Sequence, residues 1–313
     1  MIPFLLKRLL VFFPILGFVL LGSFLLLQVV PADPAAVRAG PLAPPEVVES
    51  IRKEMGLDRP LYVQLFIYVG KVASGDLGRS LISNRKVTEE LTDALGPTIE
   101  LVIVSMLWAV PAGIIFGTIA GASRGRWIDR LSMVIVVAGV SMPVFFVGIL
   151  LIWVFGFSLH WLPTNGRGGP LWTIEGWRHI VIPAVALGFV VLGPIARISR
   201  ASVIDELGSD YVRTARAKGL SRSYVVVRHA LRNALIPVVT LIGLQLGFLM
   251  GGAIVTETMF AWPGIGRLTI GAITSNDMPL AQGAIICLSA GFIIVNLIVD
   301  LLYAVLNPRI NLA

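Results

Sequence analysis

The sequence predicts an all-α polytopic membrane protein with six transmembrane helices, and two observations carry that prediction. Of its 313 residues, 56% are hydrophobic and only 14% are charged, and the mean hydropathy is +0.88. Soluble domains are far more polar. Six apolar runs also come close to the ~20 residues that a helix needs to cross a bilayer. These runs are Leu9–Val30, Thr98–Ala120, Leu131–Phe157, Ile180–Ala196, Ile236–Val255 and Gln282–Leu306.

Basic residues predict how the spans are oriented. They gather after the second span, between the fourth and fifth spans, and after the sixth, at Arg124, Arg126, Arg130, Arg197, Arg200, Arg213, Arg216, Lys218, Arg222, Arg228, Arg232 and Arg309. Short basic loops stay on the cytoplasmic side of a membrane. Both termini are therefore expected in the cytoplasm, and the net charge of +7 reflects topology, not binding to nucleic acid.

The first span, within residues 1–30, is expected to remain as an N-terminal anchor. It follows Lys7 and Arg8 and so resembles a signal peptide. However, it is long and ends in Val29-Val30-Pro31, where a signal peptide would show small residues at a cleavage site.

Residues 31–93 are expected to form an extracytoplasmic segment. Prolines at their starts predict two short helices, Pro45–Met55 and Pro60–Ser74. The run Gly75–Ser80 has the composition of a turn, and Val87–Leu95 predicts an amphipathic helix that leads back to the membrane. On the same side, the Gly- and Trp-rich stretch Trp161–Trp177 is typical of a loop at the membrane interface.

The longest strongly polar stretch between two spans is Asp210–Ser221, continued to Pro237. Ser209 or Asp210 can begin a helix, Gly219 suits the left-handed position that ends one, and Ser221 can begin the next. Two short helices joined by a tight turn are therefore expected. In the second helix, an apolar face formed by Val227, Leu231, Ala234 and Leu235 lies apart from Arg228 and Arg232. The segment is either a basic loop that only sets topology or a docking element for a soluble partner.

Gly243, Gly247 and Gly251 recur at four-residue spacing in the fifth span, with Gln245 beside them. Such spacing lets a second helix approach the backbone closely. The same small face is also suited to border a solute path, and both interpretations stay open.

Motifs for catalysis are missing. The sequence holds no glycine-rich phosphate loop, so the chain is not expected to hydrolyse ATP. The three histidines, His160, His179 and His229, fall in different loops on both sides of the membrane, which excludes a shared metal site. A lone cysteine, Cys287, excludes an internal disulfide and a cysteine cluster. We therefore expect a non-enzymatic chain without a cofactor or metal.

Several motifs, in order and over nearly the whole length, resemble the dipeptide/oligopeptide/nickel-type permease subunits of bacterial ABC importers, in particular the first permease of the pair. The motifs are Pro31-Ala32-Asp33-Pro34-Ala35, Met55-Gly56-Leu57-Asp58-Arg59-Pro60-Leu61, Gly75-Asp76-Leu77-Gly78-Arg79-Ser80, Tyr211-Val212-Arg213-Thr214-Ala215-Arg216-Ala217-Lys218-Gly219, Arg228-His229-Ala230-Leu231-Arg232-Asn233-Ala234 and Glu257-Thr258-Met259-Phe260-Ala261-Trp262-Pro263-Gly264-Ile265-Gly266. The general importer signature Glu-Ala-Ala-x-x-x-Gly falls on Arg213 to Gly219, and only Ala215 and Gly219 match it.

This resemblance implies the type I ABC importer transmembrane fold over residues 94–307, with a cytoplasmic coupling loop at 198–235. The part 208–237 would contact the ATPases. Coupling would fall to Asp210, Tyr211, Arg213, Thr214, Ala215, Ala217, Lys218, Gly219, Leu220 and Arg228. An outer cap would comprise Glu257, Phe260, Pro263 and Gly264.

The same resemblance implies the partners and the task. A homologous second permease, two ATPase subunits that bind ATP and Mg²⁺, and an extracytoplasmic solute-binding protein would complete an importer in the bacterial inner membrane. Short peptides are the expected solute, because nickel would require histidine or carboxylate ligands that the spans do not offer. Nickel complexes or another small solute such as glutathione remain alternatives. A secondary transporter without an ATPase is a further alternative, although the spans lack a buried ion relay and an inverted repeat.

Overall fold

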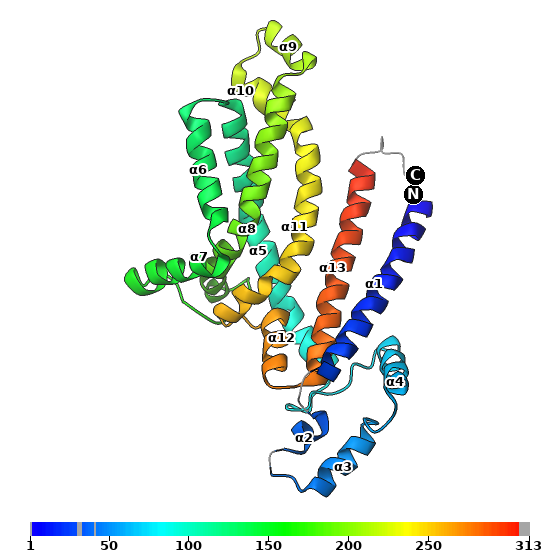
Figure 1. Ribbon diagram of the computed structural model, residues 1–313. Coiled ribbons are helices and arrows are strands. Elements are labelled where there is room, and N and C mark those ends of the chain that lie inside the picture. Colours follow the sequence, from blue (N-terminus) through cyan, green and yellow to red (C-terminus); the bar gives the residue numbers. More distant parts are fainter. Residues whose placement is uncertain (1, 30–32, 41, 307–313) are drawn as a thin grey trace. The chain divides into compact units, whose positions relative to one another are not determined.

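The computed structural model describes residues 2–29, 33–40 and 42–306, and in this part of the chain the regular structure is entirely helical (Figure 1). The helices are α1 Ile2–Val29, α2 Pro34–Ala39, α3 Pro45–Glu54, α4 Leu61–Ala73, α5 Val87–Ala122, α6 Trp127–Ser141, α7 Val144–Leu151, the π-helix η1 Ile152–Ser158, α8 Ile174–Leu207, α9 Asp210–Ala217, α10 Arg222–Tyr224, the π-helix η2 Val225–Ala230, α11 Leu231–Met259, α12 Ile265–Thr274 and α13 Met278–Leu306. The predicted all-α class is confirmed.

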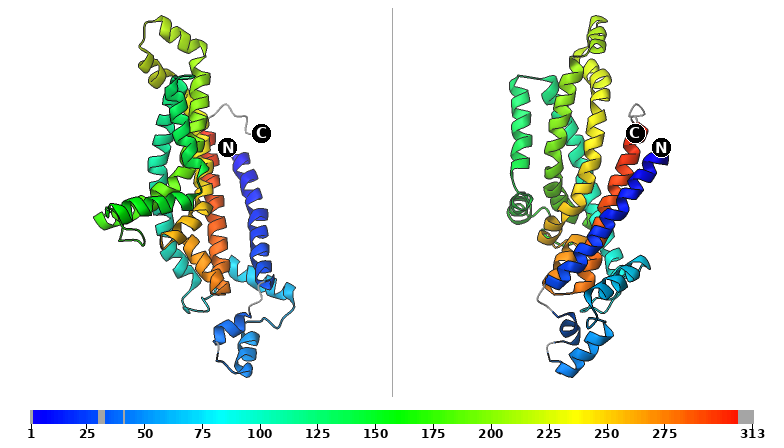
Figure 2. Two further views of the ribbon diagram at one scale, coloured as in Figure 1. Left: turned by 60° about the vertical axis from the view of Figure 1, so that its left-hand side comes forward. Right: turned by 45° about the vertical axis from the view of Figure 1, so that its right-hand side comes forward.

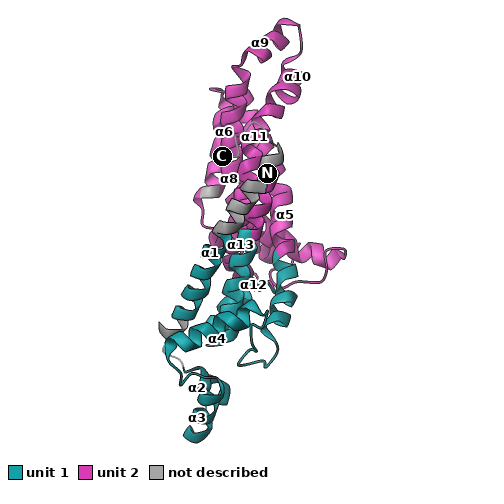
Figure 3. Cartoon of the chain, turned by 90° about the vertical axis from the view of Figure 1, so that its right-hand side faces the viewer, with its two compact units in different colours: residues 1–98, 263–293, 312–313 teal, residues 99–262, 294–311 magenta. Residues whose placement is uncertain are grey.

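The chain divides into two compact units (Figure 3). The first combines Met1–Thr98 and Pro263–Ile293 with the last two residues, and the second combines Ile99–Trp262 and Ile294–Asn311. The division falls inside α5 and α13, so two continuous helices each contribute to both units.

Four helical stretches among the described residues are long and apolar enough to cross a membrane, namely Val87–Ala122, Ile174–Leu207, Arg222–Gly251 and Met278–Val299. They correspond to the predicted second, fourth, fifth and sixth spans. In α1 the described side chains form a shorter apolar stretch, Phe12–Leu25. The count of six spans therefore stays a prediction.

The predicted third span, Leu131–Phe157, is not one straight helix. It consists of two helical parts, Trp127–Gly139 and Val144–Ser158, which are bent by 96° relative to each other. Proline lacks the N–H that a helix interior requires and disfavours the helical conformation of the residue before it. Accordingly, Met142 is extended, with φ −87° and ψ 133°, and α7 begins directly after Pro143.

A close approach of α5 and α8 organises the second unit. Added Cβ atoms at Gly113, Gly117 and Gly121 would collide with α8, and at Gly117 the nearest atom would be the Ala196 carbonyl oxygen, at 2.4 Å. Glycine at four-residue spacing is a known basis for tight helix packing in membranes. The apolar core beside this seam includes Leu101, Met106, Leu187, Val191, Ile195, Leu249 and Trp262, all of them buried.

The first unit is held together by a buried carboxylate. Asp277, directly before α13, accepts a hydrogen bond from the Ser80 hydroxyl and another from the Leu81 N–H at 3.1 Å. These bonds fix the predicted turn Gly75–Ser80. The two short helices predicted as Pro45–Met55 and Pro60–Ser74 exist as α3 and α4 with nearly those bounds.

Candidate functional site

The polar segment between α8 and α11 folds as two helices around a glycine turn, as expected. α9 begins at Asp210 after an extended Ser209, and Gly219 has a left-handed φ of +79°. Ser221 is again extended and precedes α10. The serines occupy the expected cap positions, but their side chains do not cap: the Ser209 hydroxyl instead donates to the Glu206 carbonyl at 2.6 Å.

The predicted apolar face of the second helix needs a correction. Val227 is 63% exposed, whereas Val225, Val226 and Ala230 are buried. The reason is the π-helix η2, because its wider turn rotates the residues before α11 relative to an ideal α-helix. Ala234 is buried as expected.

A small core of its own supports this segment. Val212 and Ala215 of α9 pack with Val225 and Ala230, and Leu207 at the end of α8 completes the cluster. Ala215, a predicted coupling residue, is therefore part of the packing between the helices and not of the outer surface. Val212, which sequence reasoning did not select, has the same role.

Tyr211 links three helices through its hydroxyl group. The hydroxyl donates to the Glu206 carboxylate of α8 and accepts a hydrogen bond from the Asn233 amide of α11 at 3.0 Å. Burial and the Glu206 hydrogen bond raise the pKa of Tyr211 above its ordinary value. The phenol therefore stays protonated and keeps donating at neutral pH.

The other predicted coupling residues form the exposed surface of the segment. They are Asp210, Arg213, Thr214, Ala217, Lys218, Gly219, Leu220 and Arg228. Within α9, Asp210 and Arg213 form an ion pair at 3.3 Å. The result is a compact, mainly basic surface on a packed helical base.

One side chain of α8 and one of this segment hold neighbouring helices of the same unit together. Arg200 of α8 makes a two-pronged ion pair with Asp129 of α6, at 2.7 and 2.8 Å. The second Asp129 oxygen also accepts from the Gly125 N–H at 3.0 Å. Arg222 of α10 donates to the Ala122 carbonyl at the end of α5. The Arg222 contact therefore ties α10 to α5, and the Arg200 pair ties α8 to α6.

The glycines of the fifth span do not share one environment. An added Cβ at Gly243 would lie 2.1 Å from Val299 of α13, so a helix does approach there. Gly247 is buried, whereas Gly251 is exposed and has no atom near an added Cβ. Gln245 is half-buried.

The predicted outer cap divides between the two units. In the second unit, Glu257, Phe260 and Trp262 are buried, and the Phe260 carbonyl accepts a hydrogen bond from the Gly166 N–H at 2.7 Å. In the first unit, Pro263 is exposed and Gly264 is buried directly before α12.

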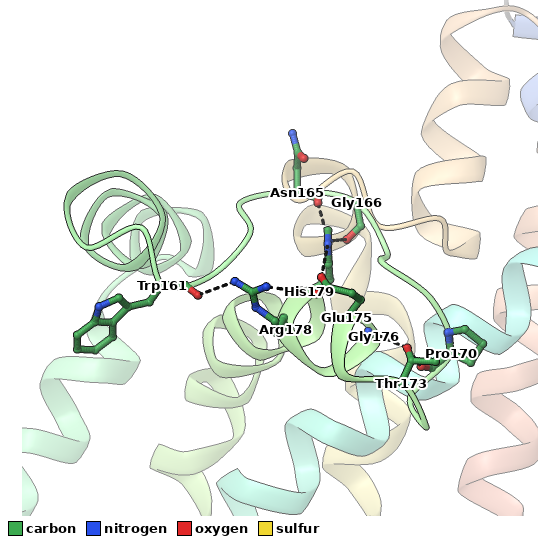
Figure 4. A network of polar contacts seen from close by, with 9 residues as sticks. All are labelled: Trp161, Asn165, Gly166, Pro170, Thr173, Glu175, Gly176, Arg178 and His179. Atoms are coloured by element: carbon green, nitrogen blue, oxygen red, sulfur yellow. Dashed lines mark hydrogen bonds and ion pairs between the residues drawn. The ribbon is translucent and has the colours of Figure 1, made fainter.

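Polar contacts order the loop between η1 and α8 (Figure 4). The His179 Nδ1 lies 3.0 Å from the Asn165 carbonyl and must donate, because a carbonyl only accepts. Thr173 caps α8 by accepting from the Gly176 N–H at 3.0 Å, and Arg178 donates to the Trp161 carbonyl.

One ion pair was missed by the sequence analysis because Glu100 lies inside an apolar run. The Arg167 guanidinium donates to Glu100 at 2.7 Å, and both side chains are largely buried. The second carboxylate oxygen of Glu100 and the Nε of Arg167 have no hydrogen-bond partner among the described residues. Glu100 could have been selected from the sequence, since a single acidic residue in a span is costly in lipid and must face protein or water.

Comparisons with known proteins cover almost the whole chain. A family model described as "Binding-protein-dependent transport system inner membrane component" matches residues 113–312, and a model of the N-terminal part of such membrane components matches residues 1–102. The chain is 47% identical over 311 residues to the glutathione transport system permease protein GsiC of Escherichia coli (strain K12), with 99% of each chain covered. The proteins of the same name from Escherichia coli O6:H1 and Shigella dysenteriae serotype 1 show the same identity and coverage.

Proposed function

Because the chain belongs to the family of binding-protein-dependent transport system inner membrane components and is the permease subunit of an ABC importer, we propose that this importer carries short peptides across the cytoplasmic membrane. Glutathione is the member of that solute class that the relatives suggest, since the matched permeases are named for it. The single observation that carries this proposal is the 47% identity over 99% of both chains.

The proposed coupling element is the segment 208–237. Its exposed residues Asp210, Arg213, Lys218 and Leu220 would enter a cleft of an ATPase subunit, while Ala215 keeps α9 in place from below. The buried cluster beneath α9 supports this role, because a surface that transmits movement to the spans must itself be rigid. ATP and Mg²⁺ would bind to two partner subunits, and this chain would catalyse no reaction.

The proposed transport step is a rigid-body change of the spans. Closure of the ATPases would move α9 and α10. The Arg222–Ala122 contact would carry the movement into α5, the Tyr211–Glu206 contact would carry it into α8, and the Arg200–Asp129 pair would pass it from α8 to α6. A second permease would complete the solute path. We assign one face of the fifth span, formed mainly by small residues, either to this path or to helix packing beside it. The residues are Gly243, Gln245, Gly247 and Gly251.

The proposed orientation places both termini and the coupling segment in the cytoplasm. The segment 31–93 and the outer cap, with Glu257, Phe260, Pro263 and Gly264, would then face the solute-binding protein. The buried positions of Phe260 and Gly264 suit a cap that shapes this surface from within, whereas Pro263 is exposed and available for contact.

Purification of the tagged chain from native membranes tests this function. We expect a second permease and two ATPase subunits to copurify. After reconstitution with the binding protein, ATP hydrolysis should increase on addition of glutathione or a short peptide and not on addition of nickel. Purification of the chain without an ATPase, together with transport driven by an ion gradient, would contradict the proposal.

A further inference from the structure

Helix α4 exposes an apolar face that the importer function does not explain. Its 13 residues, LYVQLFIYVGKVA, are apolar apart from Gln64 and Lys71 and the tyrosine hydroxyls. Tyr62, Phe66 and Val69 follow one another at helical spacing on the same side, and they are 66%, 75% and 38% exposed. Water contact with large apolar side chains on this scale marks an interaction surface.

The opposite side of α4 is fixed to the first unit. The Tyr68 hydroxyl lies 3.0 Å from the Ser23 hydroxyl of α1, and its ring lies 5.9 Å from the ring of Phe24. The Gln64 amide donates to two carbonyls of the preceding loop, those of Leu57 at 3.1 Å and Arg59 at 2.7 Å. The Tyr68 hydroxyl and the Gln64 amide are thus used internally, and the direction of the apolar face of the helix is set.

This attachment places α4 beside one end of the first apolar helix (Figures 1 and 2). α1 has 28 residues, which is ~42 Å of helix and enough to cross a bilayer. Its own exposed surface is apolar as well, with Phe13, Phe18 and Leu25 at least half exposed. The predicted first span continues past Ser23 and Phe24 to Val30. These two residues therefore lie about two helical turns inside the end of the span, and α4 lies near that boundary.

Charged residues flank α4 at both ends. Arg59 precedes its first residue by two positions, Lys71 lies in its last turn, and both are exposed. Cations and tyrosines at the edges of an apolar stretch are typical of helices in the boundary between lipid head groups and acyl chains. The neighbouring α3, with the sequence PEVVESIRKE, has no such composition, although it is equally unburied.

We propose that α4 lies in the membrane interface, with phospholipid as the partner of its exposed face. Tyr62, Phe66 and Val69 contact acyl chains, and Arg59 and Lys71 lie near lipid phosphates. Continuity with the apolar surface of α1 favours lipid over a soluble partner. The consequence is mechanical, since a lipid contact here holds the extracytoplasmic segment at a fixed depth. The inference needs the membrane location of the chain and does not depend on which solute is carried.

Depth-dependent fluorescence quenching tests this proposal on the complete complex in lipid nanodiscs. In a Cys287→Ser background, Phe66→Cys carries an environment-sensitive dye, and Ser50→Cys on the exposed part of α3 is the matched control. Nitroxide lipids labelled just below the head group should quench the dye at position 66 several-fold and leave the dye at position 50 unchanged. Phe66→Cys combined with Tyr62→Asp should lose most of this quenching, because a charge resists entry into the interface.

Two results would overturn the proposal. One is an unquenched dye at position 66 in a complex that still hydrolyses ATP on addition of solute, which would mean that the face is bare or covered by protein. The other is equal quenching at positions 66 and 50, which would mean that the dye reports contact with the disc surface in general. Neither result affects the proposed transport function, so the two proposals fail separately.

Discussion

At the residue scale, we expect the ion pair between Asp129 and Arg200 to be the contact most sensitive to mutation. Asp129 is only 4% exposed, and both of its oxygens are occupied. Removing one partner of a buried pair leaves the other uncompensated and costs up to about 3–5 kcal/mol. We expect Arg200→Met to approach the lower end of this range, since the Arg200 side chain is partly exposed.

The unfolding midpoint of the purified complex measures this effect. Arg85→Met is the matched control, because Arg85 pairs with Asp93 at 2.8 Å while both side chains are exposed. An exposed pair contributes little to stability. Equal midpoints for Arg200→Met and Arg85→Met would contradict a structural role for the Asp129 pair.

Residue-level features were predictable where the cause was local. The left-handed turn at Gly219 follows from its position between two helix signals, and the structure has φ +79° there. The burial of Ala215 and the exposure of Val227 depend on the π-helix η2, which has no sequence signature of its own. The pairing of Arg200 with Asp129 joins residues 71 positions apart, and a single sequence does not reveal such a contact.

At the scale of elements, the glycine seam between α5 and α8 makes a strong prediction. Gly117→Ala would place a methyl group 2.4 Å from a backbone carbonyl oxygen, which cannot move as a side chain would. The helices must separate, and overpacking of this kind costs about 1–3 kcal/mol. We expect a lower unfolding midpoint for Gly117→Ala and no loss for Gly96→Ala on the same helix, where an added Cβ meets nothing within 4 Å. Unchanged stability of Gly117→Ala would contradict a close contact between α5 and α8 at this position.

The ion pair between Asp33, directly before α2, and Arg52 of α3 links the two helices. The stability of this link should depend on pH. Burial acts to raise the pKa of Asp33, but the hydrogen bond from Arg52 and those from the backbone outweigh it, so the pKa lies below its usual 3.8. A lowered pKa means that stabilisation is present above the ordinary value and is lost as the pH falls through the folded-state value. Hydrogen exchange in α2 should therefore accelerate only at strongly acidic pH. In Arg52→Met it should already be fast at neutral pH, and protection that is identical in both proteins would count against the link.

Element boundaries were predicted well where prolines, glycines and caps mark them, as for α3 and α4. The break of the third span could also have been predicted from Met142-Pro143, but the apolar run is long enough to suggest one continuous helix. The tight seam on α5 was missed although Gly113, Gly117 and Gly121 have the same spacing as the glycines chosen in the fifth span. The four-residue spacing alone does not predict whether the glycines of α5 or those of the fifth span pack against a neighbouring helix.

At the scale of the whole molecule, the proposed orientation predicts which surfaces can be labelled from outside the cell. In a Cys287→Ser background, Ser50→Cys should react with a membrane-impermeant maleimide on intact spheroplasts, and Ser221→Cys should react only after lysis. Both serines are exposed on this chain, and labelling after lysis distinguishes a membrane barrier from cover by a bound ATPase. Labelling of Ser221→Cys from outside would reverse the proposed topology.

In the proposed mechanism, α9 and its glycine turn pass ATPase movement to the spans. Gly219→Asp tests it most directly, because φ +79° strains any other residue by roughly 1 kcal/mol while an added Cβ meets nothing within 4 Å. Gly208→Asp is the matched control, because Gly208 is the first position of the segment, is not one of the assigned coupling residues, and has an ordinary φ of −84°. In a pull-down followed by an ATPase assay on the reconstituted complex, Gly219→Asp should insert and bind the second permease but lose ATPase association or solute-stimulated hydrolysis, while Gly208→Asp keeps both. Full assembly with full stimulated turnover in Gly219→Asp would mean that the segment only sets topology.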